Sequence, residues 1–164
     1  MNKIEQFYEP IGKMIIAFQY LDSTLSLIFM SLVKEDPNVT MSLIAGLSFS
    51  KRLDALRALS TFKMSPYLVN ELADIIKRIG KCEDRRNTIV HSSWIGTLDG
   101  KTVFRDKPST SRKKGLIGGI FKAEIAEISD VTKTIQESHS ALLCFAKKLT
   151  SKGIIKIKIF ENVN

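Results

Sequence analysis

The apolar residues between positions 10 and 34 recur with the period of an α-helix. Their alternating spacing of three and four residues places them in one continuous seam along one side of that helix. The seam consists of Ile11, Met14, Phe18, Leu21, Leu25, Ile28 and Leu32. The run approaches the length of a membrane span, but Lys13, Gln19 and Asp22 interrupt it. The sequence therefore predicts an amphipathic helix at the centre of a helical core, and no membrane segment.

Capping residues and further apolar stripes predict the remaining helices. Pro37 ends the first helix, and Ser65 followed by Pro66 is typical of an N-cap and a first helical residue. The predicted helices cover about 10–34, 39–47, 50–62, 65–94 and 122–149. A chain of 164 residues is about one domain long. We expect a single domain over residues 1–164, an all-α bundle of long antiparallel helices.

Three segments depart from the helical pattern. Asp99-Gly100 separates two short β-prone runs, which predicts a hairpin at about 94–105. Residues 106–120 are rich in Pro, Ser, Gly and Lys and predict a mobile basic loop. Isoleucine alternates with lysine near the end of the chain, which predicts a short C-terminal strand at about 154–160 that could pair with the hairpin.

The charge of the chain indicates a polyanionic partner. The formal net charge is +8 and the pI about 9.5. One basic group lies on the fourth predicted helix and includes Lys81 and Arg85, and a second lies in the predicted loop and includes Arg112, Lys113 and Lys114. The loop residues either clamp a nucleic-acid backbone or are simply solvated.

The cysteines and the N-terminus favour a cytoplasmic protein. Cys82 and Cys144 have no metal-like spacing, so we expect two reduced thiols in or near the core and no metal site. The first ten residues lack a small-residue cleavage site, so they do not look like a signal peptide.

An arginine interrupts the core-facing stripe of the fourth predicted helix. The stripe runs through Leu68, Leu72, Ile75, Ile79 and Cys82. The next position at helical spacing is Arg86, within the segment "CEDRRNTIVHSSW". Asn87 follows directly, and His91 comes five residues after the arginine. This group is the candidate site.

The segment "RNTIVH" resembles the R-x4-6-H motif of the HEPN family, in which a polar residue follows the arginine. A small residue and a tryptophan follow the histidine, as in a recurrent version of that motif, and the order of helices from about Ile11 to Leu149 is similar. The hairpin and final strand are additions. The resemblance implies a metal-independent endoribonuclease without a cofactor, a toxin or phage-defence effector, and a homodimer with two motifs across the interface. It also covers noncatalytic modules that bind RNA, a nucleotide or a protein partner, as an accessory subunit or the partner of a nucleotidyltransferase. An antitoxin or a nucleotidyltransferase is thus a possible protein partner.

The three motif residues suit RNA cleavage. The neutral imidazole of His91 can take the proton from a ribose 2′-hydroxyl or return one to the leaving oxygen. Arg86 can stabilise the charge that develops on the phosphate, and Asn87 can hold the imidazole or a phosphate oxygen. The resemblance implies a 2′,3′-cyclic phosphate and a 5′-hydroxyl as products, and DNA would resist cleavage.

Helix geometry limits how these side chains meet. Positions five apart point about 140° away from one another, whereas Asn87 and His91 share a face. Arg86 and His91 therefore converge only if the helix loosens near His91, if the arginine wraps around, or if a second copy completes the site.

Each supporting residue has a plainer interpretation. Asp22 is either a partly exposed carboxylate or the partner of a buried arginine, and Arg86 itself could be structural, held by Asp22 or Glu83. Glu83 either tunes the motif or is solvated. Trp94 either stacks on a base or packs in the core, and His139 is expected to be a surface or packing histidine.

Overall fold

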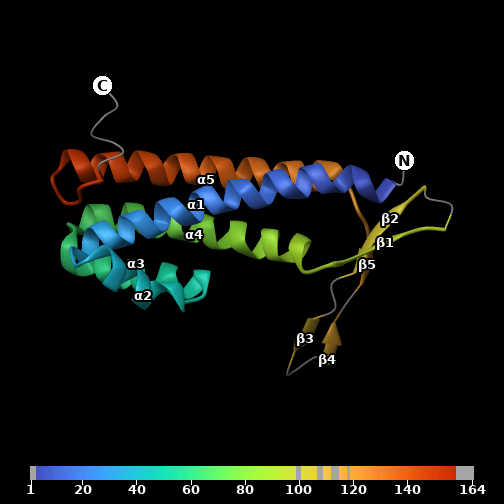
Figure 1. Cartoon of the computed structure of the whole chain (residues 1–164), viewed down its shortest axis with the longest axis horizontal. Helices are drawn as coiled ribbons and strands as arrows, with labels where there is room; N and C mark the ends of the chain where they lie inside the picture. The colour runs from blue at the N-terminus through green and yellow to red at the C-terminus, as the bar shows by residue number, and fades with distance from the viewer. Residues whose placement is uncertain (1–2, 99–100, 107–108, 112–114, 118, 158–164) are drawn as a thin grey trace.

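The computed structural model describes residues 3–98, 101–106, 109–111, 115–117 and 119–157, and it is mostly helical. A 3-10 helix η1 (Lys3–Phe7) leads into five α-helices. They are α1 (Tyr8–Val33), α2 (Pro37–Ala45), α3 (Phe49–Lys63), α4 (Pro66–Val90) and α5 (Ile125–Ser151). The helical class is thus confirmed. The long helices α1, α4 and α5 lie side by side, α2 and α3 cover one end of α4, and a small sheet extends from the other end (Figure 1).

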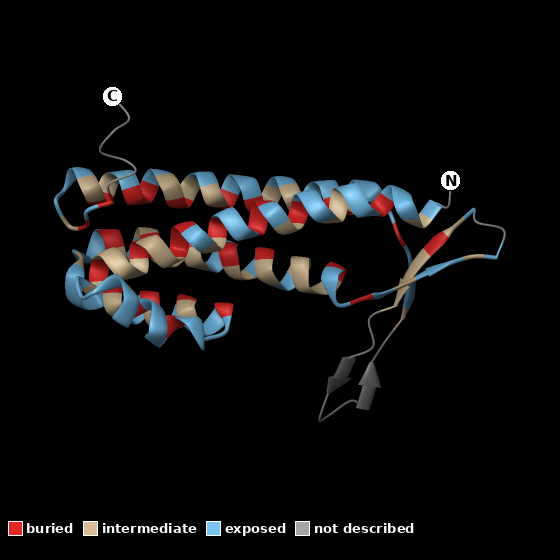
Figure 2. Ribbon diagram, in the orientation of Figure 1, coloured by how far each residue is buried: buried red, intermediate tan, exposed pale blue. Residues whose placement is uncertain are grey.

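The core is built from the predicted apolar seams. Met14, Phe18, Leu21, Leu25, Ile28 and Leu32 of α1 are all buried, and Ile11 is partly buried against them. The stripe of α4 from Leu68 to Cys82 is buried as well, and α5 adds a third seam that ends at Leu149. Buried residues line the facing sides of these helices (Figure 2). Ser65 is the N-cap of α4, although its side chain makes no capping hydrogen bond.

Helix α4 ends four residues earlier than predicted. The last helical residue is Val90, and the chain enters a strand at Ser93. The indole N–H of Trp94 donates to the carbonyl of Ile89 at 3.2 Å, and Ser92 Oγ donates to the carbonyl of Thr88. These side chains satisfy carbonyls at the helix end that would otherwise need another helical turn.

The predicted hairpin is present and gains a third strand. Strands β1 (Ser93–Gly96), β2 (Val103–Asp106) and β5 (Ile120–Lys122) form an antiparallel sheet in the order β1-β2-β5. The turn residues Asp99 and Gly100 lie outside the described residues. Arg105 pairs with Trp94 on one side and with Phe121 on the other.

The predicted mobile loop contains a second hairpin. Strands β3 (Ser109–Ser111) and β4 (Gly115–Ile117) pair antiparallel, and they project away from the helical bundle (Figure 1). Three residues per strand are too few to show a period of two, so the composition of the segment predicted a loop. Arg112, Lys113 and Lys114, which connect these strands, lie outside the described residues.

The predicted C-terminal strand is wrong over residues 154–157, and residues 158–164 lie outside the described part. Ile155 and Ile157 are buried as the alternation predicted, but they pack on the helices rather than into a ladder. Gly153 turns the chain with φ +67°. This segment lies at the end of the bundle opposite the sheet, so it cannot pair with the hairpin (Figure 1).

Two further predictions concern the cysteines and the membrane. Both cysteines are free. Cys82 is buried, but Cys144 is exposed, so the prediction of two reduced thiols in or near the core is wrong for the position of Cys144. Within the described chain one stretch, Lys3–Val33, is long and apolar enough to cross a membrane by length and composition. Its apolar seam is also the centre of the core, which an amphipathic core helix explains.

Candidate functional site

Arg86 lies half-buried on α4, where the core-facing stripe placed it. Its guanidinium carbon is 4.6 Å from the ring centroid of Phe18 on α1, a cation–π contact. One terminal nitrogen, Nη1, donates to Oδ1 of Asn87 at 2.5 Å. Its Nε is buried and has no hydrogen-bond partner among the described residues. The side chain is therefore held by an aromatic ring and an amide rather than by an acid.

The carboxylate that was a candidate partner for Arg86 binds a different arginine. Asp22 on α1 forms an ion pair with Arg52 on α3, with N–O distances of 2.7 and 2.9 Å, and both side chains are about a fifth exposed. Arg52 also donates to Ser26 at 3.2 Å. Within the described part of the chain, Arg86 forms no ion pair. Asp22 thus does orient an arginine, but that arginine is Arg52.

Two phenylalanines join these arginines in one stack. Arg52 lies over the Phe49 ring at 5.6 Å, and the rings of Phe49 and Phe18 are 4.8 Å apart. Arg86 lies over the other phenylalanine of the pair. The stack connects α3, α1 and α4, so the position of Arg86 depends on three helices. Sequence reasoning missed Arg52, although its place beside the inward-facing Phe49 and Leu53 is a usable signal.

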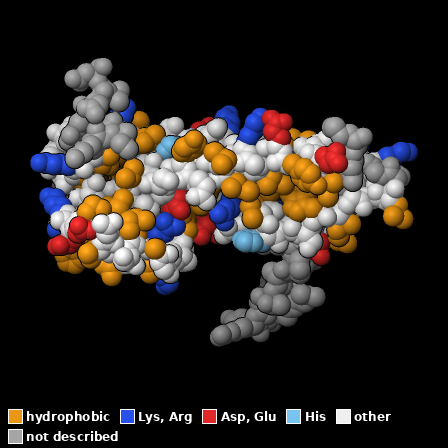
Figure 3. Space-filling model, in the orientation of Figure 1, with side chains coloured by type: hydrophobic (Ala, Val, Ile, Leu, Met, Phe, Trp, Pro, Cys, Tyr) orange, Lys and Arg blue, Asp and Glu red, His pale blue; other side chains and the backbone are white. Residues whose placement is uncertain are grey.

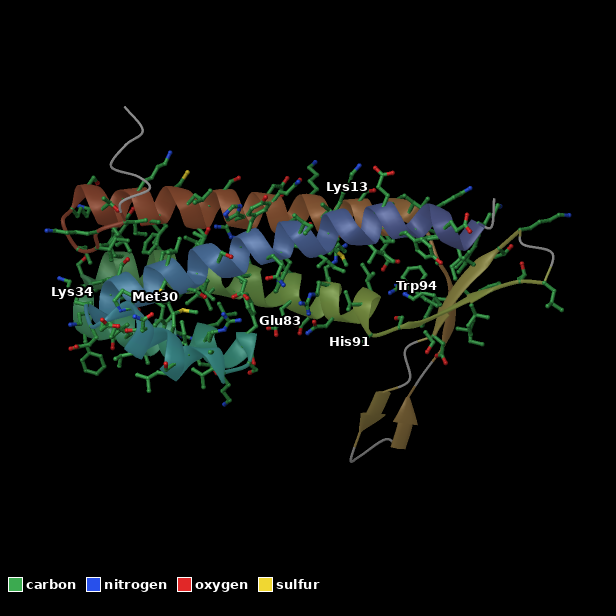
Figure 4. The ribbon with its side chains drawn as sticks, in the orientation of Figure 1. Lys13, Met30, Lys34, Glu83, His91 and Trp94 are labelled. Carbon is green, nitrogen blue, oxygen red and sulfur yellow. The ribbon has the colours of Figure 1, made fainter. Side chains whose placement is uncertain are left out.

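Glu83 lies three residues before Arg86 on α4 and is half-buried (Figure 4). Burial raises the pKa of its carboxyl above the ordinary value, and the neighbouring Asp84 raises it further. Arg86 and Arg52 act on this pKa in the opposite direction. Glu83 is therefore close enough to sense both arginines, yet it is not an ion-pair partner of either.

His91 is the C-cap of α4 and is exposed. Its backbone N–H donates to the carbonyl of Asn87 at 3.0 Å, and its own backbone has left the helical conformation, with φ −95° and ψ 8°. Figure 4 shows His91 at the end of the helix. The helix therefore ends at the histidine, but among the described residues no hydrogen bond or ring contact joins the side chains of Arg86 and His91.

Asn87 connects the other two motif residues. Its side-chain oxygen accepts from Arg86, and its backbone carbonyl accepts from His91. The amide nitrogen of Asn87 makes no hydrogen bond to described residues and can donate to a ligand. Asn87 therefore contacts Arg86 through its side chain and His91 through its backbone carbonyl.

The predicted RNA-binding residues differ in their exposure, ion pairing and packing. Lys81 is exposed on α4. Arg85 forms an ion pair with Asp130 of α5 at 2.7 Å, so part of its charge is already neutralised. Trp94 packs against Phe7 with ring centroids 5.2 Å apart and is partly buried, which corresponds to its core-packing interpretation.

The second histidine lies elsewhere. His139 on α5 is half-buried, its Nε2 is 2.9 Å from Thr24 Oγ1, and burial lowers its pKa. Sequence reasoning placed it as a surface or packing residue, and its contacts are those of packing. Among the described residues, no group of three His, Cys, Asp or Glu side chains could hold a metal ion.

No protein-family model, curated protein or solved structure significantly matches this chain.

Proposed function

We propose that the chain is a metal-independent endoribonuclease of the HEPN type. One observation supports this function best: the guanidinium of Arg86 is held by Phe18 and Asn87 and forms no ion pair with a described carboxylate, and an exposed histidine follows about one turn later. A half-buried cation without an acidic partner is costly unless a ligand supplies the negative charge. A phosphate diester supplies that charge.

The proposed reaction uses the three motif residues of one chain. His91 takes the proton from a ribose 2′-hydroxyl, whose oxygen attacks the adjacent phosphorus while the bond to the 5′-oxygen breaks. The leaving oxygen takes a proton from the imidazolium or from water. Arg86 and the amide nitrogen of Asn87 stabilise the additional charge on the non-bridging oxygens. The products are a 2′,3′-cyclic phosphate and a 5′-hydroxyl.

The biological setting of this proposal comes from the motif resemblance. It is a toxin or phage-defence effector in the cytoplasm, held in check by an antitoxin or by a nucleotidyltransferase partner. Lys81, Arg112, Lys113 and Lys114 are the proposed contacts to the RNA backbone.

A noncatalytic module that binds RNA, a nucleotide or a protein partner is the second candidate. The observation in its favour is that, among the described residues, no side chain or backbone group hydrogen-bonds to the imidazole of His91. A general base is usually oriented by such a partner. In this alternative Arg86 still binds phosphate, but His91 has no chemical role.

Cleavage assays with purified protein separate the two candidates. Wild type, Arg86→Ala, His91→Ala and the matched control His139→Ala are incubated in excess chelator with RNA and with DNA of the same sequence. We expect wild type and His139→Ala to cut RNA only, leaving cyclic phosphate ends. Both motif variants should lose about 100-fold or more in rate, as expected for loss of an acid–base or charge-stabilising group.

If no cleavage is seen, measurements of RNA binding by the same variants distinguish the two candidates. If no protein cuts RNA but Arg86→Ala weakens RNA binding while His91→Ala does not, the binding module replaces the enzyme. Equal cutting by all four proteins would indicate a contaminant or another site and would contradict our assignment.

A further inference from the structure

A groove lies on the surface between α1 and α5, which both begin near the sheet and run side by side (Figure 1). Its main hollow has a volume of about 570 Å³, which is within the range of small-molecule sites. A second hollow of about 380 Å³ continues it toward the sheet. The two hollows share Lys13, Thr132 and Gln136. They therefore form one continuous site, which we call the α1–α5 groove.

The end of the groove farther from the sheet is apolar and aromatic. Ile16, Ala17 and Tyr20 of α1 line it together with His139 of α5. Tyr20 is 63% exposed and Ile16 is 56% exposed, and hydrophobic side chains gather over α1 in Figure 3. The rings of Tyr20 and His139 are nearly parallel, with an interplanar angle of 13° and centroids 6.4 Å apart. This end of the groove therefore suits a planar aromatic group, which can stack against such rings.

The hydrogen bonds of His139 define what its imidazole offers to a ligand. Thr24 Oγ1 donates its only hydrogen to the carbonyl of Tyr20 at 3.0 Å, so it accepts from Nε2 of His139, which lies 2.9 Å away. Burial lowers the pKa of the imidazole, which favours the neutral form. In that form Nδ1 carries no proton. Nδ1 makes no hydrogen bond to the described residues, so it can accept one from a ligand.

The end of the groove nearer the sheet has a net positive charge. Of the described residues that line the two hollows, the charged ones are Lys13, Lys133 and Glu9. Lys13 pairs with Glu9 at 2.6 Å, and Lys133 lies 4.0 Å from Glu137. All four side chains are mostly exposed, so water screens both pairs. An ammonium group has three donors, so each lysine keeps N–H groups for an anionic ligand.

The spacing of these groups limits the length of a ligand that contacts both ends. Tyr20 comes seven residues after Lys13, and His139 comes six residues after Lys133. With a rise of about 1.5 Å per residue, the rings lie about 10 Å along the helices from the lysines. Gln136 lines both hollows and lies between these positions. An aromatic ring and an acidic group joined by a short linker can span this distance, because the lysine side chains are long.

Size favours a small molecule over a protein as the occupant. Among the described residues, the exposed large hydrophobic side chains that line the groove are Ile16, Tyr20 and Ile125. Three side chains of about 200 Å² each, already partly covered, offer much less than the roughly 800 Å² per partner of a standard protein interface. The volume of the main hollow instead corresponds to a small organic molecule.

We propose that the α1–α5 groove binds a small aromatic acid whose ring carries a hydroxyl or N–H donor. The ring lies beside Tyr20 and His139, its donor bonds to Nδ1 of His139, and its acidic group contacts Lys13 and Lys133. Lys13 and His91 lie on opposite sides of α1 (Figure 4). The groove is therefore separate from the candidate nuclease site, and the inference does not depend on the nuclease proposal.

Isothermal titration calorimetry of the full chain, without RNA, tests the proposal with three matched probes. The first, p-coumarate, has a planar ring, a hydroxyl donor and a carboxylate. The second, p-methoxycinnamate, lacks the donor, and the third, methyl p-coumarate, lacks the charge. We expect wild type to bind p-coumarate about fivefold more tightly than either analogue, as for loss of one hydrogen bond or one charge contact. Equal binding of all three probes, or no binding of p-coumarate at millimolar concentration, would overturn the proposal.

Substitutions at the two ends of the groove assign the contacts. His139→Phe keeps a ring but removes the acceptor, so it should bind p-coumarate and p-methoxycinnamate equally. The double variant Lys13→Gln, Lys133→Gln should lose the preference for p-coumarate over its methyl ester. Its matched control is Lys51→Gln, Lys77→Gln, which changes the net charge equally at exposed positions of α3 and α4. This control should keep both preferences. Both preferences retained in the groove variants would show that the probe binds elsewhere and would overturn the assignment.

Comparison of the probes within one variant separates ligand recognition from a folding effect. A variant that is only destabilised loses affinity for all three probes in proportion to its folded fraction and keeps its preferences. Tyr20→Leu gives a further measurement, because this side chain is mostly exposed and its loss leaves the core intact. It should weaken binding of all three probes by about fivefold, since the ring contact is lost. Unchanged affinity in Tyr20→Leu would contradict the proposed position of the aromatic ring.

Discussion

Arg52 and Arg86 lie at the two ends of the same aromatic stack, but only one of them has an acidic partner. Arg52 shares its charge with Asp22, whereas Arg86 donates to the neutral amide of Asn87. A partly buried arginine that is paired with a carboxylate stabilises the fold or lowers its stability only slightly. An arginine without such a partner can still attract an anion from solution. The difference between the two arginines separates a structural residue from a candidate ligand-binding one.

Removing the acid of the paired arginine should therefore destabilise the fold. Asp22→Ala leaves Arg52 about four-fifths covered without a counter-ion, and we expect the free energy of unfolding to fall by about 2 kcal/mol. Urea denaturation measures this value. Glu9→Ala is the control, because Glu9 and Lys13 are mostly exposed, and its effect should be much smaller than that of Asp22→Ala. Equal losses in the two variants would mean that the Asp22 pair is no better than a surface pair.

The residue-level prediction from sequence was correct in part. The period of α4 placed Arg86 toward the core, and this follows from local geometry alone. The choice of Arg52 rather than Arg86 as the partner of Asp22 depends on how α3 packs against α1. That packing is a tertiary property of residues 30 positions apart, and no local pattern encodes it.

At the level of secondary-structure elements, the ends of α4 and α5 determine where the candidate site lies and where the helical bundle stops. Helix α4 stops at Val90 because Trp94 and Ser92 satisfy its last carbonyls. Helix α5 ends in a turn at Gly153, whose N–H donates to the carbonyl of Thr150 at 2.9 Å. Periodicity identifies the middle of a helix well, but the end depends on side chains from beyond it. The sequence interpretation therefore extended α4 over the first two residues of β1.

Two glycines give opposite predictions for the same substitution. Gly153 has φ +67°, a conformation that disfavours side chains, so Gly153→Ala should lower the free energy of unfolding by about 1 kcal/mol. Gly80 lies within α4 with open space at its Cβ position, so Gly80→Ala should raise it by about 1 kcal/mol or slightly less. Thermal or urea unfolding of both variants decides the matter. Changes of the same sign would contradict the assigned helix end.

For the whole molecule, the sheet and the helical bundle are joined through a small contact region. Trp94 of β1 packs on Phe7 of η1, and Arg105 of β2 forms an ion pair with Glu127 of α5. Val103 of β2 is buried in the common core. The hydrophobic seams predicted the bundle. They could not predict this junction, because it is formed by few residues that are distant in sequence.

We expect the sheet and the bundle to unfold as one unit. Trp94 is the only tryptophan, so its fluorescence reports the junction, while far-ultraviolet circular dichroism reports the helices. The two urea transitions should coincide. Phe7→Ala, which empties a buried site, should shift both to lower urea by a loss of about 3 kcal/mol. A fluorescence transition at lower urea than the loss of helix would show that the sheet detaches first.

The position of His91 links the candidate site to the sheet. Only Ser92 separates His91 from the first residue of β1, whereas Arg86 packs on Phe18 of α1. A change in the orientation of β1 would therefore move the backbone of His91 more directly than that of Arg86.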